Sequence, residues 1–182
     1  MGDNMRVITG TARGMKLVTL EGQATRPTRE AVKEALFSMI QFEIEGARVL
    51  DLFAGCGQLG IEALSRGAAS CVFTDNSPEA VKVIKENLTH TRLMNKSRVA
   101  CCDYTAALNG TFDIAFVDPP YASLLMEKIL PRLVSCMSDG GVIVCETSPE
   151  TALPEEVNGF KKTVSRRYGK SNITLYRKET AI

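Results

Sequence analysis

The chain has 182 residues, enough for one domain with a substantial core and hardly enough for two. Its 45% hydrophobic and 24% charged residues are typical of a globular protein, which excludes whole-chain disorder and a small disulfide scaffold. We expect neither a membrane span nor a secretory signal, because no apolar run approaches about 20 residues and the N-terminus lacks a basic stretch followed by an apolar one.

The net charge of +1 hides an uneven distribution of basic residues. Residues 6–29 contain five basic residues and one acid, and residues 161–178 contain seven basic residues and no acid. Basic ends around an acidic middle suggest a polyanionic partner. The alternative is an edge hairpin whose lysines and arginines discourage aggregation.

The cysteines and the single histidine, His90, do not predict a metal site. None of the six cysteines forms a C-x-x-C pair, and a zinc site needs about four clustered ligands. We therefore expect no metal, and reduced cysteines in the apolar strands of a cytoplasmic protein.

The N-terminal region predicts a hairpin followed by a helix. Residues 5–20 have the pattern of two short strands around Ala12–Gly14. From Arg29 to Ile40, apolar residues recur at helical spacing, and Thr28 is the expected N-cap.

From Gly46 onward, strands and helices alternate, which predicts an α/β fold with a mostly parallel sheet covered on both faces. The C-terminal part instead predicts an antiparallel hairpin at the edge of this sheet, giving seven strands in total. We expect one domain over residues 1–182, with an N-terminal extension at 1–45 and a core at 46–182. The expected strands are 48–53, 70–75, 98–103, 112–118, 142–146, 160–168 and 173–177, and the expected helices of the core are 59–66, 78–90 and 123–135.

A glycine loop between the first strand and its helix predicts a nucleoside-type cofactor. Residues 55–60 match G-x-G-x-x-G, and Asp75 lies 20 residues after Gly55, where a carboxylate can bind ribose hydroxyls. Asp51, at the end of the preceding strand, would repel a pyrophosphate and suits a cationic ligand. S-adenosylmethionine, which has a ribose, an amino group and a sulfonium but no phosphate, fits better than NAD. Asp103, at the end of the third strand, is a candidate acceptor for an adenine amino group.

The sequence Asp118-Pro119-Pro120-Tyr121 ends the fourth strand and suits methylation of an exocyclic amine. Such an amine is a poor nucleophile, because its lone pair is delocalised into the ring. The Asp118 carboxylate and the Pro119 carbonyl can accept its two hydrogens, since the prolines form a rigid loop without N–H groups. Tyr121 can stack on the base. Asp113, within the fourth strand, we interpret as structural.

Taken together, these motifs resemble the bacterial 16S ribosomal RNA guanine-N2 methyltransferases. The resemblance runs from Arg6 to Arg177, nearly the whole chain. The motifs that carry it are residues 51–68, which contain the glycine loop, and residues 6–17, 26–37 and 167–177 near the two ends. It implies a Rossmann-like class I methyltransferase fold and methylation of one guanine N2 amine of 16S ribosomal RNA, within a small-subunit particle, by a cytoplasmic monomer. The sequence departs from the family pattern at three positions. Cys56 and Gln58 stand where we expect smaller residues, and Asp75 stands where we expect Glu.

The residues expected to function fall into three groups. The catalytic candidates are Asp118, Pro119, Pro120 and Tyr121. The candidates for binding S-adenosylmethionine are Asp51, Gly55, Gly57, Asp75, Asn76, Asp103 and Tyr104. The RNA-binding candidates are Arg6, Arg13, Lys16, Arg26 and Arg29.

Two alternative functions remain open at this stage. The chain could methylate another amine, such as a DNA adenine or a protein glutamine, although glutamine methyltransferases usually carry Asn where Asp118 stands. It could also be a non-catalytic RNA-binding module, although such a module has no need of an intact Asp-Pro-Pro-Tyr loop.

Overall fold

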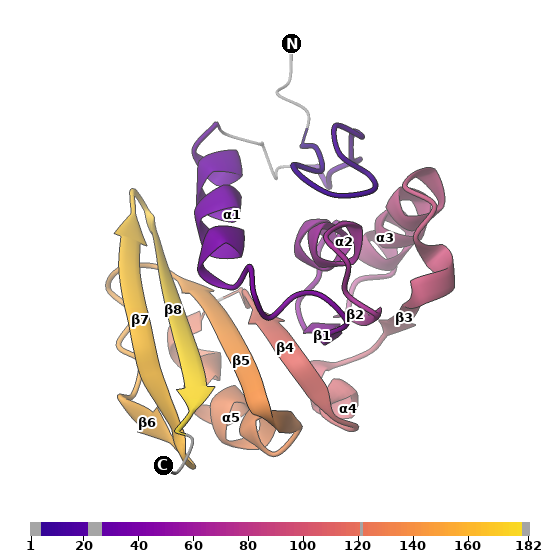
Figure 1. The fold of residues 1–182 in the computed structure, drawn as a ribbon. Helices are drawn as coiled ribbons and strands as arrows, with labels where there is room; N and C mark the ends of the chain where they lie inside the picture. Colours follow the sequence, from indigo (N-terminus) through magenta and orange to yellow (C-terminus); the bar gives the residue numbers. More distant parts are fainter. Residues whose placement is uncertain (1–4, 22–26, 121, 180–182) are drawn as a thin grey trace.

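The protein is built around one eight-stranded sheet, seen in a computed structural model that describes residues 5–21, 27–120 and 122–179. The strand order is β3-β2-β1-β4-β5-β8-β7-β6 (Figure 1). The five strands from β3 to β5 are parallel, whereas β8 is antiparallel to β5 and to β7. The bounds are β1 (Arg48–Asp51), β2 (Ser70–Asp75), β3 (Ser97–Cys101), β4 (Phe112–Val117), β5 (Met137–Thr147), β6 (Glu156–Val157), β7 (Phe160–Tyr168) and β8 (Ser171–Lys178).

The α/β architecture predicted from the sequence is confirmed, and the seven expected strands are all present. The additional strand, β6, has two residues and pairs with the start of β7 at the sheet edge. Its brevity explains why no periodic pattern indicates it.

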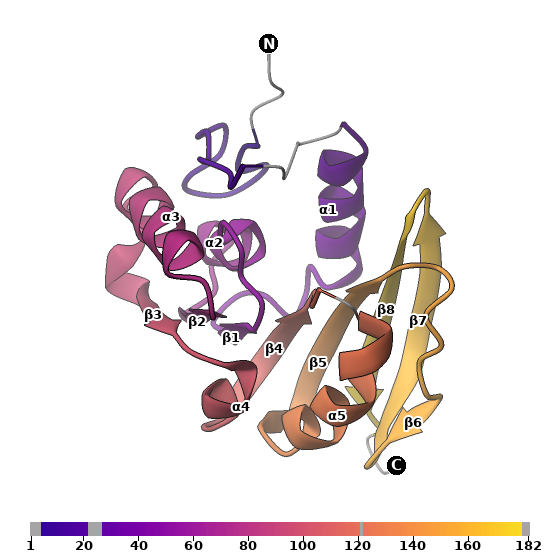
Figure 2. The same ribbon diagram turned by 180° about the vertical axis from the view of Figure 1, so that it is seen from behind.

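Helices cover both faces of the sheet (Figures 1 and 2). On one face, α1 (Pro27–Met39), α2 (Gln58–Ser65) and α3 (Pro78–His90) contribute to a core that also includes the N-terminal segment. On the other face, α4 (Tyr104–Ala107) and α5 (Ala122–Val134) contribute to a second core. A short 3-10 helix covers Met94–Lys96. None of the described helices is both long and apolar enough to cross a membrane.

Local differences from the expected elements have simple causes. Helix α1 begins at Pro27, so Thr28 lies inside the helix and is not its N-cap; proline is favoured at a first helical position because its missing N–H needs no partner there. The four residues of α4 are too few for a visible periodicity. By contrast, Ser77 caps α3 as expected, and its Oγ accepts the Ala80 N–H at 3.3 Å.

The N-terminal segment, residues 5–19, forms a hairpin held by few backbone bonds. Its only bridge among the described residues pairs Arg6 with Lys16. The Val7 N–H donates to Met15 O at 3.0 Å, and the Leu17 N–H donates to Met5 O at 2.7 Å. The two predicted strands are therefore present as a loop with a hairpin path, and Figure 1 shows this loop lying above α2 and α3.

The strand order changes direction between β1 and β4. The chain moves from β1 to β2 and β3 on one side, and then crosses to β4 on the other side of β1. Ligands of such sheets bind outside the carboxyl ends of the strands at this switch point. Asp51 ends β1 and Asp118 directly follows β4, so both predicted site residues lie there.

Candidate active site

The glycine loop turns the chain sharply from β1 into α2. Gly55 and Gly57 have φ angles of 58° and 84°, in the left-handed region that favours glycine. Gly60, inside α2, packs against β2: a Cβ atom there would lie 2.3 Å from Phe73 Cε1 and 2.7 Å from Cys71 Sγ. The three glycines therefore allow the turn and the close contact between helix and sheet.

Asp51 lies beneath this loop and is 3% exposed. Its Oδ2 accepts the Gly60 N–H at 2.9 Å, which ties the end of β1 to the first turn of α2. Burial raises the pKa of Asp51 to about 7, and the nearby Asp75 adds to this rise, whereas the bond from Gly60 opposes it. A cation bound nearby would favour the ionised form.

Asp75, at the end of β2, connects the glycine loop to α3. Its Oδ2 accepts the Gly55 N–H at 3.0 Å, and its Oδ1 accepts the Ser77 N–H at 2.9 Å. Because a carboxylate offers about four acceptor positions, two remain for a ligand. Asp75 is half-buried, so those positions can be reached from solvent.

Asp103 follows β3 and caps the short helix α4. Its Oδ1 accepts the Thr105 N–H at 2.9 Å and the Thr105 hydroxyl at 2.6 Å, and these bonds lower the pKa of Asp103. The neighbouring Tyr104 ring packs 5.8 Å from the Phe53 ring, which follows β1. Asn76, after β2, is exposed. The predicted cofactor residues thus come from the carboxyl ends of β1, β2 and β3.

Asp118 lies at the carboxyl end of β4, with Pro119 buried and Pro120 exposed after it. The surrounding protein raises the pKa of Asp118 to about 8, Glu146 and Asp51 raise it further, and Arg29 lowers it. The side chain still reaches solvent, so a ligand can contact it. Tyr121 lies outside the described residues, and its stacking role stays a prediction.

Glu146 is a candidate site residue that the sequence analysis missed. It lies near the end of β5, as Asp118 follows β4, and its Oε1 accepts the Ser171 hydroxyl at 2.9 Å. The signal in the sequence is the same one that indicated the other acids: a carboxylate closing an apolar strand.

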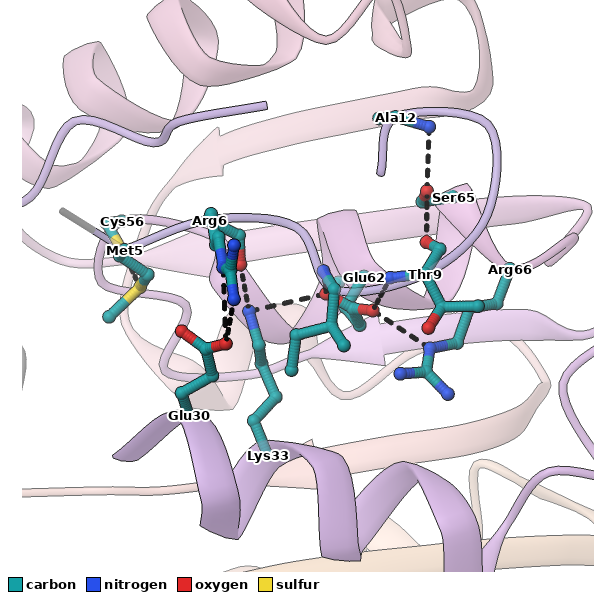
Figure 3. A network of polar contacts seen from close by, with 12 residues as sticks. Met5, Arg6, Thr9, Ala12, Glu30, Lys33, Cys56, Glu62, Ser65 and Arg66 are labelled. Atoms are coloured by element: carbon teal, nitrogen blue, oxygen red, sulfur yellow. Dashed lines mark hydrogen bonds and ion pairs between the residues drawn. The ribbon is translucent and has the colours of Figure 1, made fainter. Parts of the chain in front are cut away.

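A buried ionic network holds the N-terminal segment against α2 (Figure 3). Glu62, on α2, is fully buried and accepts the Ile8 and Thr9 N–H groups at 2.9 and 3.0 Å. It also forms ion pairs with Lys33 of α1 at 3.3 Å and with Arg66 at 2.9 Å. The network therefore joins three parts of the chain around one carboxylate.

Two further side chains fix the same segment. Ser65 Oγ accepts the Ala12 N–H at 2.9 Å and donates to Thr9 O at 2.7 Å (Figure 3). Asn87, buried in α3, accepts the Val18 N–H at 2.8 Å and donates to the carbonyl oxygens of Val18 and Cys56, both at 2.9 Å. Asn87 thus contacts both the N-terminal segment and the glycine loop.

The predicted RNA-binding residues have different surroundings. Arg6 forms an ion pair with Glu30 at 2.8 Å. Arg13, Lys16 and Arg29 are exposed and form no ion pair with the residues that the structure describes, whereas Arg26 lies outside those residues. Lys16, Lys85 and His90 line a groove of about 880 Å³ between residues 16–19 and the second half of α3.

Four of the seven basic residues of the C-terminal hairpin form ion pairs with acids. Lys161 pairs with Glu179 and Lys162 with Glu155. Outside the hairpin, Asp113 of β4 pairs with Arg48 of β1, as the structural acid that we expected. The remaining basic residues in ion pairs on this hairpin are Arg177 and Lys178. Among the described residues, each basic end keeps three exposed basic side chains outside ion pairs: Arg13, Lys16 and Arg29 at one end, and Arg166, Arg167 and Lys170 at the other.

All six cysteines are reduced in the structure, and four of them are buried. The described parts of the chain contain no group of three or more His, Cys, Asp or Glu side chains close enough to bind a metal ion.

Comparison with known proteins shows the family of this chain. A family model described as "Conserved hypothetical protein 95" matches residues 5–177. The chain belongs to this family. Its members include methyltransferase D of the small subunit ribosomal RNA from Escherichia coli (strain K12), which is 30% identical over 96% of this chain and 90% of its own length.

Two other similar proteins are also named as methyltransferases. YlbH of Bacillus subtilis (strain 168), named as a candidate rRNA methyltransferase, is 38% identical over 96% of this chain and 99% of its own. The solved structure of YhhF from Escherichia coli, named as a candidate methyltransferase, has a TM-score of 0.86 and 30% identity, covering 98% of this chain and 99% of its own. The fold is thus that of a methyltransferase family.

Proposed function

We propose that this protein transfers a methyl group from S-adenosylmethionine to the exocyclic N2 amine of one guanine in 16S ribosomal RNA. The observation that carries the proposal is the Asp118-Pro119-Pro120 loop, which follows β4 beside the glycine loop that follows β1. Membership of a family that contains small-subunit rRNA methyltransferases supports ribosomal RNA as the substrate.

The residues at the carboxyl edge fit S-adenosylmethionine. Asp75 retains acceptor positions for the ribose hydroxyls, and the glycine loop lets the backbone approach a ligand closely. Asp51, which is buried with a raised pKa, favours a positive charge nearby. When bound, this cofactor supplies an electrophilic methyl group on a positively charged sulfonium.

The Asp118 loop can hold the nucleophile. The Asp118 carboxylate and the Pro119 carbonyl each accept one hydrogen of the amine, which fixes the nitrogen lone pair in line with the methyl group. Because the pKa of Asp118 is raised, its carboxylate is also suited to receive the proton that the methylated amine releases.

The N-terminal segment supplies the surface for the RNA backbone. Arg13 and Lys16 are exposed there, and the groove beside Lys16 adds Lys85 and His90 from α3. Such phosphate contacts position a nucleic acid without reading its sequence. We expect the protein to act as a cytoplasmic monomer on a small-subunit particle.

The test of the chemistry is methyl transfer in vitro. Purified protein is incubated with labelled S-adenosylmethionine and with either naked 16S RNA or small-subunit particles from a strain that lacks the enzyme. Mass spectrometry of the nucleosides should show N2-methylguanosine. Methylation of either the naked RNA or the particles supports the proposal. Methylation of DNA adenine or of a protein glutamine instead, or RNA binding without methylation, would overturn the proposal.

The test of the RNA surface is the salt dependence of binding. Arg13→Ala with Lys16→Ala should weaken RNA binding and flatten the plot of log affinity against log salt by about two units. Arg166→Ala with Lys170→Ala, on the C-terminal hairpin, is the matched control. If the control variant loses affinity and slope while the first keeps both, the RNA surface is at the other end of the chain.

A further inference from the structure

Glu146 and Asp118 stand side by side at the carboxyl edge. β4 and β5 are parallel neighbours in which Val117 is aligned with Cys145. The next residues are Asp118, which directly follows β4, and Glu146 of β5. Neighbouring strands lie about 4.8 Å apart. The preceding aligned pair on the same face, Phe116 and Val144, packs into one core with α1 and α2. Since side chains two residues apart share a face, both carboxylates rise on the α1 side of the sheet.

Glu146 is held from the far side by β8. The Ser171 hydroxyl donates to Glu146 Oε1, which leaves Oε2 without a hydrogen bond from the described residues. The electrostatic effect of Glu146 on Asp118 agrees with the proximity that the register gives. Two adjacent carboxylates repel each other, and this cost is offset when a ligand donates to both.

The edge of guanine that carries N2 provides such a pair of donors. The N2 amine lies beside N1–H, so guanine presents hydrogens to two neighbouring acceptors. Adenine and cytosine instead place a ring nitrogen that is an acceptor beside their amine, and this nitrogen would face the second carboxylate. Sites built to bind a donor reject analogues that lack it, because a buried polar group is left unpaired.

We propose that Glu146 determines the specificity for guanine by accepting the N1–H of the target base while Asp118 holds the N2 amine. This inference rests on the proposed function and adds the recognition of the base. Ser171 is then a positioning residue, because it acts through Glu146.

The decisive experiment changes the hydrogen-bonding group on each partner. Glu146→Gln removes one acceptor and adds an amide N–H. RNA carrying 2-aminopurine at the target position keeps the C2 amine but has an acceptor at N1 and no oxygen at C6. Wild-type enzyme should prefer guanine. In Glu146→Gln, kcat/KM for guanine should fall about tenfold to a hundredfold, as for loss of a charge-assisted bond, and kcat/KM for 2-aminopurine should rise.

Controls separate this inference from its alternatives. Glu150→Gln removes an exposed acid four residues away and should leave the guanine preference unchanged. Ser171→Ala should lower the preference less than Glu146→Gln does. The pH profile of kcat/KM in Glu146→Gln should shift to lower pH, because one of the causes that raise the pKa of Asp118 is gone.

The two possible failures are distinguishable. If wild-type enzyme methylates no guanine of the ribosomal RNA, the proposed function fails. If wild-type enzyme methylates guanine and Glu146→Gln keeps the wild-type ratio of guanine to 2-aminopurine, only the role of Glu146 is overturned.

Discussion

Carboxylates lie in two regions of the protein with different surroundings. Glu62, beneath the N-terminal segment, receives two backbone N–H groups and two basic side chains. At the carboxyl edge of the sheet, Asp51 receives one backbone N–H, and Asp118 receives no hydrogen bond from the described residues. The number of donors, rather than burial alone, separates a carboxylate that holds the fold together from one that can serve a ligand.

The largest effect expected from this comparison is on stability. Glu62→Ala leaves Lys33 buried without its counter-charge and two N–H groups without acceptors, so the free energy of unfolding should fall by about 3–5 kcal/mol. Urea unfolding followed by circular dichroism measures this loss. Adding Lys33→Met should recover part of it, and a loss below about 1 kcal/mol would show that the network contributes little.

At the carboxyl edge, the corresponding effect should be on turnover. Asp118→Asn should lower kcat on the order of 100-fold, because a preorganised acceptor of the reacting amine is lost. The free energy of unfolding should not fall, since no donor among the described residues loses its partner. Single-turnover methylation and urea unfolding of the same preparation test both statements, and an unstable but active variant would reverse the comparison.

Asp51 should affect how the stability of the protein depends on pH. Burial raises its pKa to about 7 in the folded protein, so between about pH 4 and 7 the folded state binds more protons than the unfolded state, and stability falls as pH rises through this window. Asp51→Asn keeps an acceptor for the Gly60 N–H and removes this pH dependence. Its stability relative to wild type should therefore improve by on the order of 2 kcal/mol from pH 5 to pH 8 in the absence of cofactor. Equal slopes for both proteins would contradict the assignment.

The smallest effect concerns Arg29, the exposed base that lowers the pKa of Asp118. Arg29→Ala should move the pH profile of kcat/KM to higher pH and reduce activity at neutral pH by about two- to fivefold, as expected for an exposed charge pair. Lys16→Ala, which removes an exposed base from another part of the N-terminal region, should leave the profile in place. A shift in both variants would indicate a general effect of net charge.

Sequence alone predicts the carboxyl edge because each part of it is local. The glycine loop, the acids at the strand ends and the Asp-Pro-Pro sequence all lie within a few residues of the strand that positions them. Glu146 follows the same rule and could have been found, but it has no recognisable motif around it. The fold class was equally accessible, because strands alternate with helices along the core and most of these elements can be recognised from their own residues.

The network around Glu62 could not be predicted in the same way. Its backbone partners, Thr9 and Ile8, lie 53 and 54 residues away in the sequence. A glutamate in an otherwise apolar helix gives no indication of which N–H groups it binds. The N-terminal hairpin was predicted as two strands, yet part of its backbone bonds to the side chains of Glu62, Ser65 and Asn87. Patterns of alternation report burial and do not distinguish a strand partner from a side-chain partner.

The docking of the N-terminal segment also sets an order of events during synthesis. Glu62, the partner of Ile8, is synthesised 54 residues after it, and Asn87, the partner of Val18, is synthesised 69 residues after it. At about 5–20 residues per second, these backbone groups stay without their native partners for roughly 3–14 s. The first part of the chain to leave the ribosome therefore joins the core only after α3, near the middle of the chain, has been made, and the surface that we propose for RNA forms only then.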